Sequence, residues 1–392
     1  MTMLSAILGL LALLAMAPVT VLLFQVLIAL VAQRPAELLK NRRPSVGILI
    51  PAHDEAVVIA ATLDSIFPQL AVGDHVLVVA DNCSDETAII SRNLGAEVVE
   101  RNDLELRGKG YALDFGVSRM RDNPPEVVII IDADCLVQPG AIDRLARKCI
   151  DTSLPVQALY LMLSPPGAGL KTHIAEFAWV VRNKIRPLGY QRLGLSCQLM
   201  GTGMAFPWTA ISKAVLASGH IVEDMKFGID LALAGYPAVF CPEATVTSTF
   251  PIDQNAEDTQ RTRWEHGHLS MILHEFPRLL ACALRERNTR LLGLAIDLLV
   301  PPLSLLALIV IVISAFNLIF FLFEGIFWPL NVSLITLGLF ITAITIAWYR
   351  WGRKIISFLS VLVIPLYILS KVPLYFRFLT KRQKSWVKTE RD

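Results

Sequence analysis

The hydrophobic pattern of the chain begins with a long apolar segment. Residues 3–31 carry no charged side chain, and the first charge in the chain is Arg34. The segment is long enough to cross a bilayer with some tilt, and Pro18 predicts a kink in it. A signal peptide would have a shorter apolar core and a basic start. Basic residues follow at once, so the positive-inside rule predicts an N-terminus outside the cell and a cytosolic chain from residue 44 onward.

From Ser45 to about Arg290, short apolar runs alternate with helical patterns. The apolar runs predict buried parallel strands at Val46–Pro51, Val76–Ala80 and Val127–Ile131. The helical patterns predict helices at Ala56–Gln69, Asp85–Asn93, Lys109–Arg121 and Ala141–Ile150. Repeated β-α units of this kind predict an α/β fold with a doubly wound sheet, on which ligands bind at the carboxyl ends of the strands.

The last part is apolar again. Pro302–Phe323 and Leu330–Tyr349 are predicted spans, whereas Ile355–Leu379 is interrupted by Pro365, Lys371 and Pro373. A basic tail prefers the cytosol, so we interpret Ile355–Leu379 as re-entrant or interfacial, with a fourth span as the alternative. The expected order is a transmembrane helix (1–33), a catalytic domain (44–250), interfacial helices (251–298), two transmembrane helices (299–349), the ambiguous segment (355–379) and a basic cytosolic tail (380–392).

Composition supports a membrane protein with a cytosolic domain. Of the 392 residues, 54% are hydrophobic and 18% are charged, which is too apolar for an average soluble protein. The net charge of +2 and the lack of a strongly basic domain argue against nucleic acid as a partner. Six scattered cysteines without a C-x-x-C pair fit a reducing cytosol better than a disulfide framework.

The first candidate for chemistry is the D-x-D motif at Asp132 and Asp134. A buried strand brings both carboxylates to the carboxyl end of the sheet, and the two-residue period of an extended chain sends them to the same side. Two hard oxygen ligands side by side suit Mg²⁺ or Mn²⁺, which would offset the charge of a substrate diphosphate. The alternative is a capped strand end with solvated acids.

Three further loops carry polar groups to the same edge. Pro51, His53 and Glu55 follow the first strand and Asp81 follows the second, where a nucleotide base and ribose would lie. Lys109, in an R-G-K-G segment that opens a helix, suits an anionic phosphate. Ordinary turn and N-cap chemistry, or a flexible surface loop, would also place these residue types there.

Two motifs remain in the later part of this region. Glu223 and Asp224 lie in the first turn of a predicted helix, where Asp224 could act as a general base on an acceptor hydroxyl; favourable helix-dipole charge is the alternative. Gln260, Arg263 and Trp264 share one helix face, where a guanidinium suits a phosphate and an indole suits a sugar ring; a packing seam is the alternative. His266 and His268 are expected to be structural.

Together these motifs resemble the membrane-bound family 2 glycosyltransferases, which include synthases of cellulose, hyaluronan and poly-N-acetylglucosamine. Four signatures match in order: I-P-A-H-D-E, D-x-D, E-D and Q-x-x-R-W. The resemblance implies a GT-A fold, a cytosolic catalytic domain at the inner membrane and inverting chemistry on a nucleotide diphosphate sugar, expected to be a UDP-sugar. Asp81 and Asp132 would contact the nucleoside, Asp134 the metal, and Asp224 would be the base, with Glu223 beside it. Gln260, Arg263 and Trp264 would hold the diphosphate and cover the acceptor end, next to an acceptor-side loop at Thr202.

The sequence departs from that family in two places. Asp81-Asn82 replaces the usual acidic pair, and fewer apolar helices are present than in the large cellulose synthases. Q-x-x-R-W favours growth of an envelope or extracellular polysaccharide, assisted by other synthesis and export proteins, whereas the few spans favour addition of one sugar to a membrane lipid. A phosphatase of the haloacid-dehalogenase type and a transporter subunit are weaker alternatives, because neither explains Q-x-x-R-W or the polar residues of the central domain.

Overall fold

The computed structural model describes residues 3–31, 42–218, 222–251 and 254–361, with five further positions between 364 and 375. The chain divides into two compact units. We call them the sheet unit (Gln33–Pro165, Leu195–Arg263 and Lys384–Asp392) and the helical unit (Met1–Ala32, Pro166–Gly194 and Trp264–Gln383). The segment 166–194 therefore groups with the apolar helices, although it lies between two strands of the sheet in sequence.

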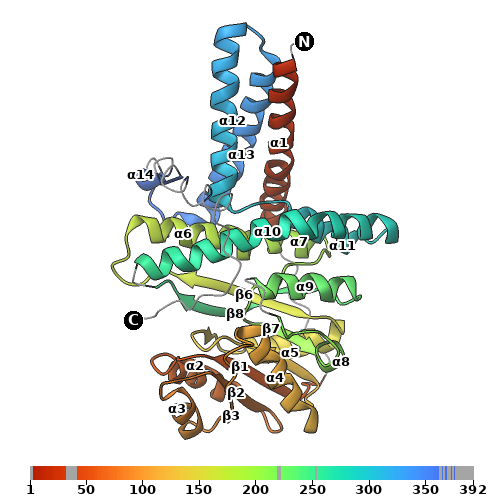
Figure 1. Cartoon of the computed structure of the whole chain (residues 1–392), viewed down its shortest axis with the longest axis vertical. Coiled ribbons are helices and arrows are strands. Elements are labelled where there is room, and N and C mark those ends of the chain that lie inside the picture. Colours follow the sequence, from red (N-terminus) through yellow and green to blue (C-terminus); the bar gives the residue numbers. More distant parts are fainter. Residues whose placement is uncertain are drawn as a thin grey trace. The chain divides into compact units, whose positions relative to one another are not determined.

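One mixed sheet of eight strands, in the order β3-β2-β1-β4-β7-β6-β8-β5, forms the centre of the sheet unit (Figure 1). Strands β3, β2, β1 and β4 are parallel neighbours, β7 is antiparallel to β4 and to β6, β8 runs parallel to β6, and β5 is antiparallel to β8. The bounds are β1 Val46–Ala52, β2 His75–Asp81, β3 Glu97–Arg101, β4 Val127–Ile130, β5 Leu136–Val137, β6 Val156–Leu163, β7 Met204–Pro207 and β8 Val239–Thr249.

The core of this unit consists of the strands that the apolar runs predicted. Ile48, Leu49, Ile50, Ile129 and Ile130 are completely buried. Burying such a side chain contributes about 1.5–3 kcal/mol, so these central strands dominate the stability of the sheet. The predictions for β1, β2 and β4 are confirmed to within a residue or two at each end.

Helices of the sheet unit lie against the strands. They are α2 Ile59–Ile66, α3 Thr87–Asn93, α4 Lys109–Arg119, α5 Ala141–Thr152, α8 Trp208–Ile211 and α9 Glu223–Leu233. Helix α4 packs closely on the sheet, since a Cβ at Gly116 would lie 2.3 Å from a methyl carbon of Leu49. The first four of these helices were predicted. Helix α2 begins three residues later than expected, and the predicted third helix ends in a 3-10 turn at Met120–Asp122.

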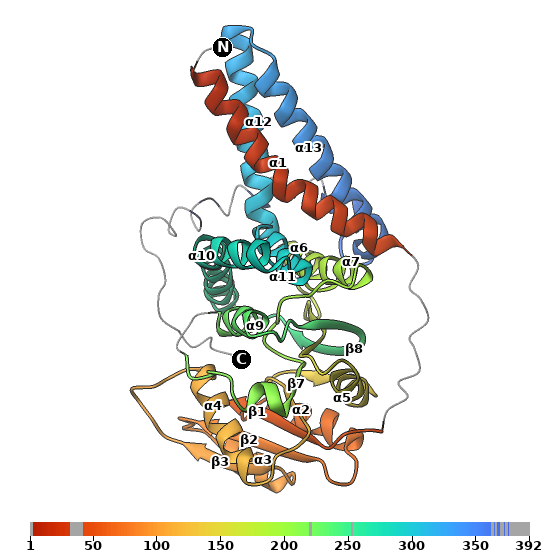
Figure 2. The same ribbon diagram turned by 90° about the vertical axis from the view of Figure 1, so that its right-hand side faces the viewer.

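Among the described residues of the helical unit, three helices are long and apolar enough to cross a membrane: Met3–Leu30, Leu303–Glu324 and Trp328–Gly352. These correspond to α1, α12 (Leu303–Glu324), and α13 (Trp328–Ala347) extended by the π-helix η4 (Trp348–Gly352). They match the three predicted apolar segments, and their crossing of a membrane stays a prediction. Helix α1 continues through Pro18 and changes direction near its middle (Figure 2). Most of the ambiguous segment 355–379 lies outside the described residues, apart from the short helix α14 (Phe358–Val361).

The other helices of this unit are α6 (Leu170–Val180), the π-helix η3 (Val181–Ile185), α7 (Arg186–Arg192), α10 (Gln254–Glu286), which begins in the sheet unit, and α11 (Thr289–Leu298). A buried polar cluster joins α7, α11 and α1. Arg186 donates to the Asp297 carboxylate at 2.9 Å, and Gln25 donates to the same oxygen at 2.7 Å. All three residues are more than nine-tenths buried: Arg186 is 5% exposed, Asp297 8% and Gln25 0%. The backbones of α7 and α1 also approach closely, because a Cβ at Gly189 would lie 2.4 Å from the Gln25 carbonyl.

Candidate active site

The D-x-D carboxylates lie in a tight loop directly after β4. The Asp132 amide donates to Thr202 Oγ1 at 3.0 Å, and the Asp132 carbonyl accepts the amide of Cys135 at 3.1 Å. Ligand atoms of Asp132, Asp134 and Cys135 all lie within 4.8 Å of one another. Both carboxylates are half-buried, and Cys135 is fully buried. The two aspartates that the sequence singled out are therefore close enough to share one cation.

The donor chemistry of this loop suits a hard divalent ion. Burial raises the pKa of the Cys135 thiol well above its usual value, and the charges of Asp134 and Asp132 raise it further. The thiol therefore stays protonated and leaves the carboxylate oxygens as the ionised donors, which is the donor type that Mg²⁺ and Mn²⁺ prefer.

Lys109, the first residue of α4, lies at the centre of this cluster. Its ammonium group forms an ion pair with Asp132 and donates to the Gly201 carbonyl at 2.8 Å. Burial alone would lower its pKa, but the charges of Asp132, Glu223 and Asp224 outweigh burial and raise the pKa to about 12. The sequence predicts Lys109 as a phosphate ligand, which stays a prediction; in the structure the lysine also neutralises the acids of the site.

Glu223 and Asp224 begin helix α9 and lie close enough to Lys109 for their charges to act on it. A Cβ at Gly201 would lie 3.4 Å from Asp224 Oδ2 and 3.7 Å from the Lys109 ammonium nitrogen, so these groups surround the same glycine. Burial, followed by the charge of Asp224, raises the pKa of Glu223 to about 7, although the Lys109 and Arg263 cations act in the opposite direction. A carboxyl group that titrates near neutral pH is suited to proton transfer.

The loop that holds Gly201 and Thr202 depends on a residue that the sequence reasoning missed. Gln157, completely buried in β6, donates to the Thr202 carbonyl at 2.9 Å and accepts the Met200 amide at 2.8 Å. Gly203 adopts φ +64°, and a Cβ there would lie 2.8 Å from the Ala158 Cβ. A lone glutamine in an otherwise apolar run was the only available signal, because its partners lie more than forty residues away.

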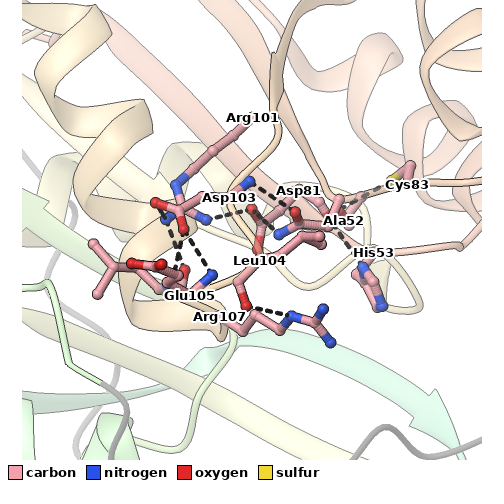
Figure 3. Close-up of polar contacts among 11 residues, drawn as sticks. Ala52, His53, Asp81, Cys83, Arg101, Asp103, Leu104, Glu105 and Arg107 are labelled. Carbon is pink, nitrogen blue, oxygen red and sulfur yellow. Dashed lines mark hydrogen bonds and ion pairs between the residues drawn. The ribbon is translucent and has the colours of Figure 1, made fainter.

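The loops after β1 and β2 form a second cluster in the sheet unit, at the predicted place for a base and ribose. His53 Nδ1 lies 2.7 Å from the Asp81 carbonyl oxygen, and the Glu55 amide donates to Thr87 Oγ1 at 2.8 Å; Pro51 lies within β1. The Asp81 carboxylate is paired with Arg101 at 2.6 Å, which the sequence reasoning also missed (Figure 3).

A third acidic group, formed by Asp54, Cys83 and Asp85, is explained by turn chemistry. Asp54 accepts the Ser84 amide at 2.6 Å, and Asp85 accepts the Thr87 amide at 3.0 Å and the Ala56 amide at 3.0 Å. These hydrogen bonds fix the loops after β1 and β2, which carry the second cluster.

The Q-x-x-R-W segment lies on α10, where the two units meet in sequence. Arg263 belongs to the sheet unit and its charge reaches Glu223. Trp264 belongs to the helical unit, where its ring centroid lies 4.8 Å from that of Trp179. The Gln260 side chain lies outside the described part of the structure. His266 and His268 are buried in the helical unit, and His268 faces the Leu298 carbonyl at 3.4 Å.

Comparison with known protein families shows which family the chain belongs to. The family described as "Glycosyltransferase like family 2" matches residues 44–267, which is more than half of the chain. The chain belongs to this glycosyltransferase family. The match ends just beyond Trp264, so it contains all four motifs and both clusters of this family 2 member.

One curated relative is similar at the level of sequence. The probable glycosyltransferase YdaM of Bacillus subtilis (strain 168) is 25% identical over 248 residues, covering 59% of this chain and 56% of that protein. The family 2 chain therefore matches just over half the length of this relative.

Two solved structures are similar to this chain. The mannosyltransferase PcManGT of Pyrobaculum calidifontis, solved with GDP-Man and Mn²⁺, has a TM-score of 0.55 at 16% identity, covering 96% of this chain and all of that one. The glucosyl-3-phosphoglycerate synthase of Mycobacterium tuberculosis, solved with Mn²⁺, UDP-Glc and phosphoglyceric acid, has a TM-score of 0.41 at 21% identity, covering 60% of this chain and 85% of that one. The first likeness confirms the predicted GT-A fold.

Proposed function

We propose that the chain is an inverting, metal-dependent glycosyltransferase that transfers a sugar from a nucleotide diphosphate sugar, expected to be a UDP-sugar, to an acceptor hydroxyl at the membrane. The observation that carries this proposal is the convergence of Asp132, Asp134 and Lys109 with the first turn of α9, which presents Glu223 and Asp224. Family membership and the complexes of Mn²⁺ with nucleotide sugars in structural neighbours support it.

Different residues of the chain would have different roles in such a transfer. Asp132 and Asp134 would hold Mg²⁺ or Mn²⁺, which supplies positive charge for the departing nucleotide diphosphate. Lys109 adds a fixed positive charge beside Asp132, and Arg263 adds a second near Glu223. The partly buried, charged surroundings strengthen these interactions relative to water.

Asp224 removes the proton of the attacking hydroxyl, as the resemblance implies, and Glu223 controls its charge. Because burial and the charge of Asp224 hold the pKa of Glu223 near 7, the pair gains or loses a proton around neutral pH. General-base catalysis of this type contributes about 10²–10⁴-fold in rate. Attack opposite the leaving group turns an α-linked donor into a β-linked product.

For the acceptor, the Q-x-x-R-W segment supports a growing envelope or extracellular polysaccharide. A lipid acceptor is the second candidate. The three apolar helices among the described residues bury only 33%, 28% and 28% of their span windows within the protein, so most of their surface is left for lipid rather than packed into a bundle that could enclose a sugar chain. In either case we place the sheet unit in the cytosol at the inner membrane, with the N-terminus outside, and expect polysaccharide synthesis or export proteins as partners for the first.

One experiment tests the reaction and the acceptor together. Full-length protein in detergent is incubated with a panel of nucleotide sugars, Mn²⁺ and a membrane lipid extract, and the products are analysed by mass spectrometry. We expect transfer that stops in excess chelator and falls about 100-fold or more in Asp134→Asn. The matched control is Asp122→Asn, since the Asp122 side chain is 78% exposed and pairs only with Arg119 on the surface. Full activity of Asp134→Asn, or full turnover in chelator, would contradict the metal role.

A further inference from the structure

Both π-helices described in the helical unit carry basic side chains. Lys184 lies in η3, and Arg350 lies in η4, the last turn of the third apolar helix. The two regions pack tightly, since a Cβ at Gly352 in η4 would lie 2.5 Å from a ring carbon of Phe177 in α6, which continues directly into η3. Single π-helical turns within helices frequently occur at functional sites. The packing of α6 on η4 therefore brings one basic residue of each π-helix into the same region.

Lys184 and Arg350 are close enough for their charges to repel each other. Burial lowers the pKa of the half-buried Lys184 ammonium group, and the charge of Arg350 lowers it further. Among the residues that the structure describes, no carboxylate forms an ion pair with either side chain, and the Arg350 guanidinium lies over the ring of Trp351, 5.6 Å from its centroid. Two cations held together without an acid cost stability, so the pair has a place for a negative charge from outside the chain.

The lack of an acid at this pair is a local feature. Arg186, two residues after Lys184, is paired with Asp297 at 2.9 Å. Arg278 of the same unit is paired with Glu275 at 3.2 Å. The helical unit therefore does contain acids that neutralise its cations, and η3 and η4 differ from those places.

The neighbours of Arg350 favour a lipid over a free ion. Trp348, Tyr349 and Trp351 lie beside it in η4, and aromatic side chains of this kind are enriched at membrane–water interfaces. Phe358 of α14 packs on Trp348, with ring centroids 5.9 Å apart, and is largely exposed. A ligand with acyl chains and a phosphate group fits both the exposed rings and the two cations.

We propose that Lys184 and Arg350 form a binding site for the phosphate group of an anionic phospholipid at the end of the third apolar helix. The guanidinium offers paired N–H donors that match phosphate oxygens, and the ammonium group adds a point charge from η3. The bound lipid supplies the missing negative charge and joins η3 to η4. The site rests on the placement of this helix end at the membrane surface, and it does not depend on the sugar-transfer reaction.

A first test uses thermal unfolding of the full chain in nanodiscs of two compositions. Because the pKa of Lys184 is lowered, its charge destabilises the fold when no anion is bound, in full below the folded pKa and not at all above 10.5. At pH 7, Lys184→Gln should therefore melt at or above the wild-type temperature in neutral phosphatidylcholine. When phosphatidylglycerol is added, wild type should gain stability and Lys184→Gln should gain less. A loss of melting temperature that is the same in both lipids would show that Lys184 serves packing alone.

A second test measures affinity for short-chain phosphatidylglycerol by titration calorimetry in detergent. Near an anionic membrane surface, each basic residue contributes about fivefold in affinity, so Lys184→Gln/Arg350→Gln should lose about 25-fold. The matched control is Arg353→Gln/Lys354→Gln, which removes the same charge from two exposed positions just after η4. At about 0.5 M salt, screening should abolish the effect of the control, whereas the half-buried Lys184 should keep most of the loss.

Two outcomes of the titrations would overturn the lipid site. Equal losses in the two double variants at high salt would leave general surface charge as the explanation. Inorganic phosphate that binds wild type as tightly as the short-chain lipid would assign the two cations to a free anion. Both outcomes are independent of sugar transfer, so they leave the proposed function unchanged.

Discussion

Lys109 and Asp132 form an ion pair between the first residue of α4 and the loop after β4. Acidic groups outnumber the cation here, because Asp132, Glu223 and Asp224 all act on the one ammonium group. Lys109 therefore strongly influences the electrostatic potential of the acidic cluster. Binding of a cation or protonation of one group there changes the potential at every other group.

Replacing Lys109 by methionine should reduce transfer activity at pH 7.5 by about tenfold or more, since three acids lose their shared counter-charge. The folded pKa of Lys109 is about 12, above the ordinary value of 10.5. Its stabilising effect, about 2 kcal/mol, is fully present below pH 10.5 and is lost as pH rises through 12. Thermal unfolding of both proteins at pH 8 measures it. Lys148→Met is the control, as Lys148 donates to the Phe240 carbonyl at 2.7 Å outside the site. Equal activity of the two variants would contradict the prediction.

Activity should fall as pH drops through about 7, because burial and the charge of Asp224 raise the pKa of Glu223 to that value. The folded pKa lies above the ordinary 4.5, so the ionised form is destabilising, and the protein loses stability as pH rises from 4.5 to 7. Glu223→Gln should therefore raise the melting temperature at pH 8 but not at pH 4.5. In the same variant the acid limb of the pH–rate profile should move to lower pH. A profile identical to wild type would exclude Glu223 as the titrating group.

Gly203→Ala should destabilise the sheet unit and reduce activity, because the added Cβ meets Ala158 at 2.8 Å and shifts the loop that holds Thr202. Gly95→Ala is the matched control. Gly95 also has positive φ, at +97°, but no atom lies within 4 Å of its added Cβ. Backbone strain alone costs about 1–2 kcal/mol, so the control reports that cost and the difference between the two reports the clash. Chemical denaturation with activity measured in parallel distinguishes them, and equal losses would contradict the role of the contact.

Asp297→Ala should destabilise the helical unit by about 3–5 kcal/mol, since it leaves the Arg186 guanidinium buried without its carboxylate. Glu100→Ala removes an ion pair with Arg92 that is shorter, at 2.5 Å, but whose side chains are 47% and 50% exposed, and it should cost about 1 kcal/mol or less. Thermal unfolding in one detergent compares the two. If both variants melt alike, the buried cluster does not stabilise the packing of α7 and α11.

The parts of the fold that could be predicted are those where local pattern and burial agree. Strands β1, β2 and β4 are continuous apolar runs, and the three span helices are apolar throughout. Edge strand β3 was missed because its sequence, Glu97–Arg101, is mostly charged. Strands β6, β7 and β8 were missed because their pairing is long-range and partly antiparallel, which no local pattern encodes.

The candidate site shows the same limit. Its acids follow recognisable strand ends and helix starts, so Asp132, Asp134, Glu223 and Asp224 could be found from the sequence. Gln157 and Arg101 act through partners on other strands, and a sequence gives no distance between them. The phosphate role of Lys109 stays a prediction, and its ion pair with Asp132 could not be found from the sequence, because the two residues lie on separate elements.

The grouping of residues 166–194 with the helical unit has a practical consequence. The chain leaves the sheet after β6, passes through α6 and α7, and returns to complete it with β7, the neighbour of β4. A fragment covering residues 44–263 would therefore carry Arg186 without Asp297 and α7 without α1. We expect such a fragment to aggregate when made alone, so biochemical work on this enzyme has to begin with the intact chain in a detergent or lipid environment.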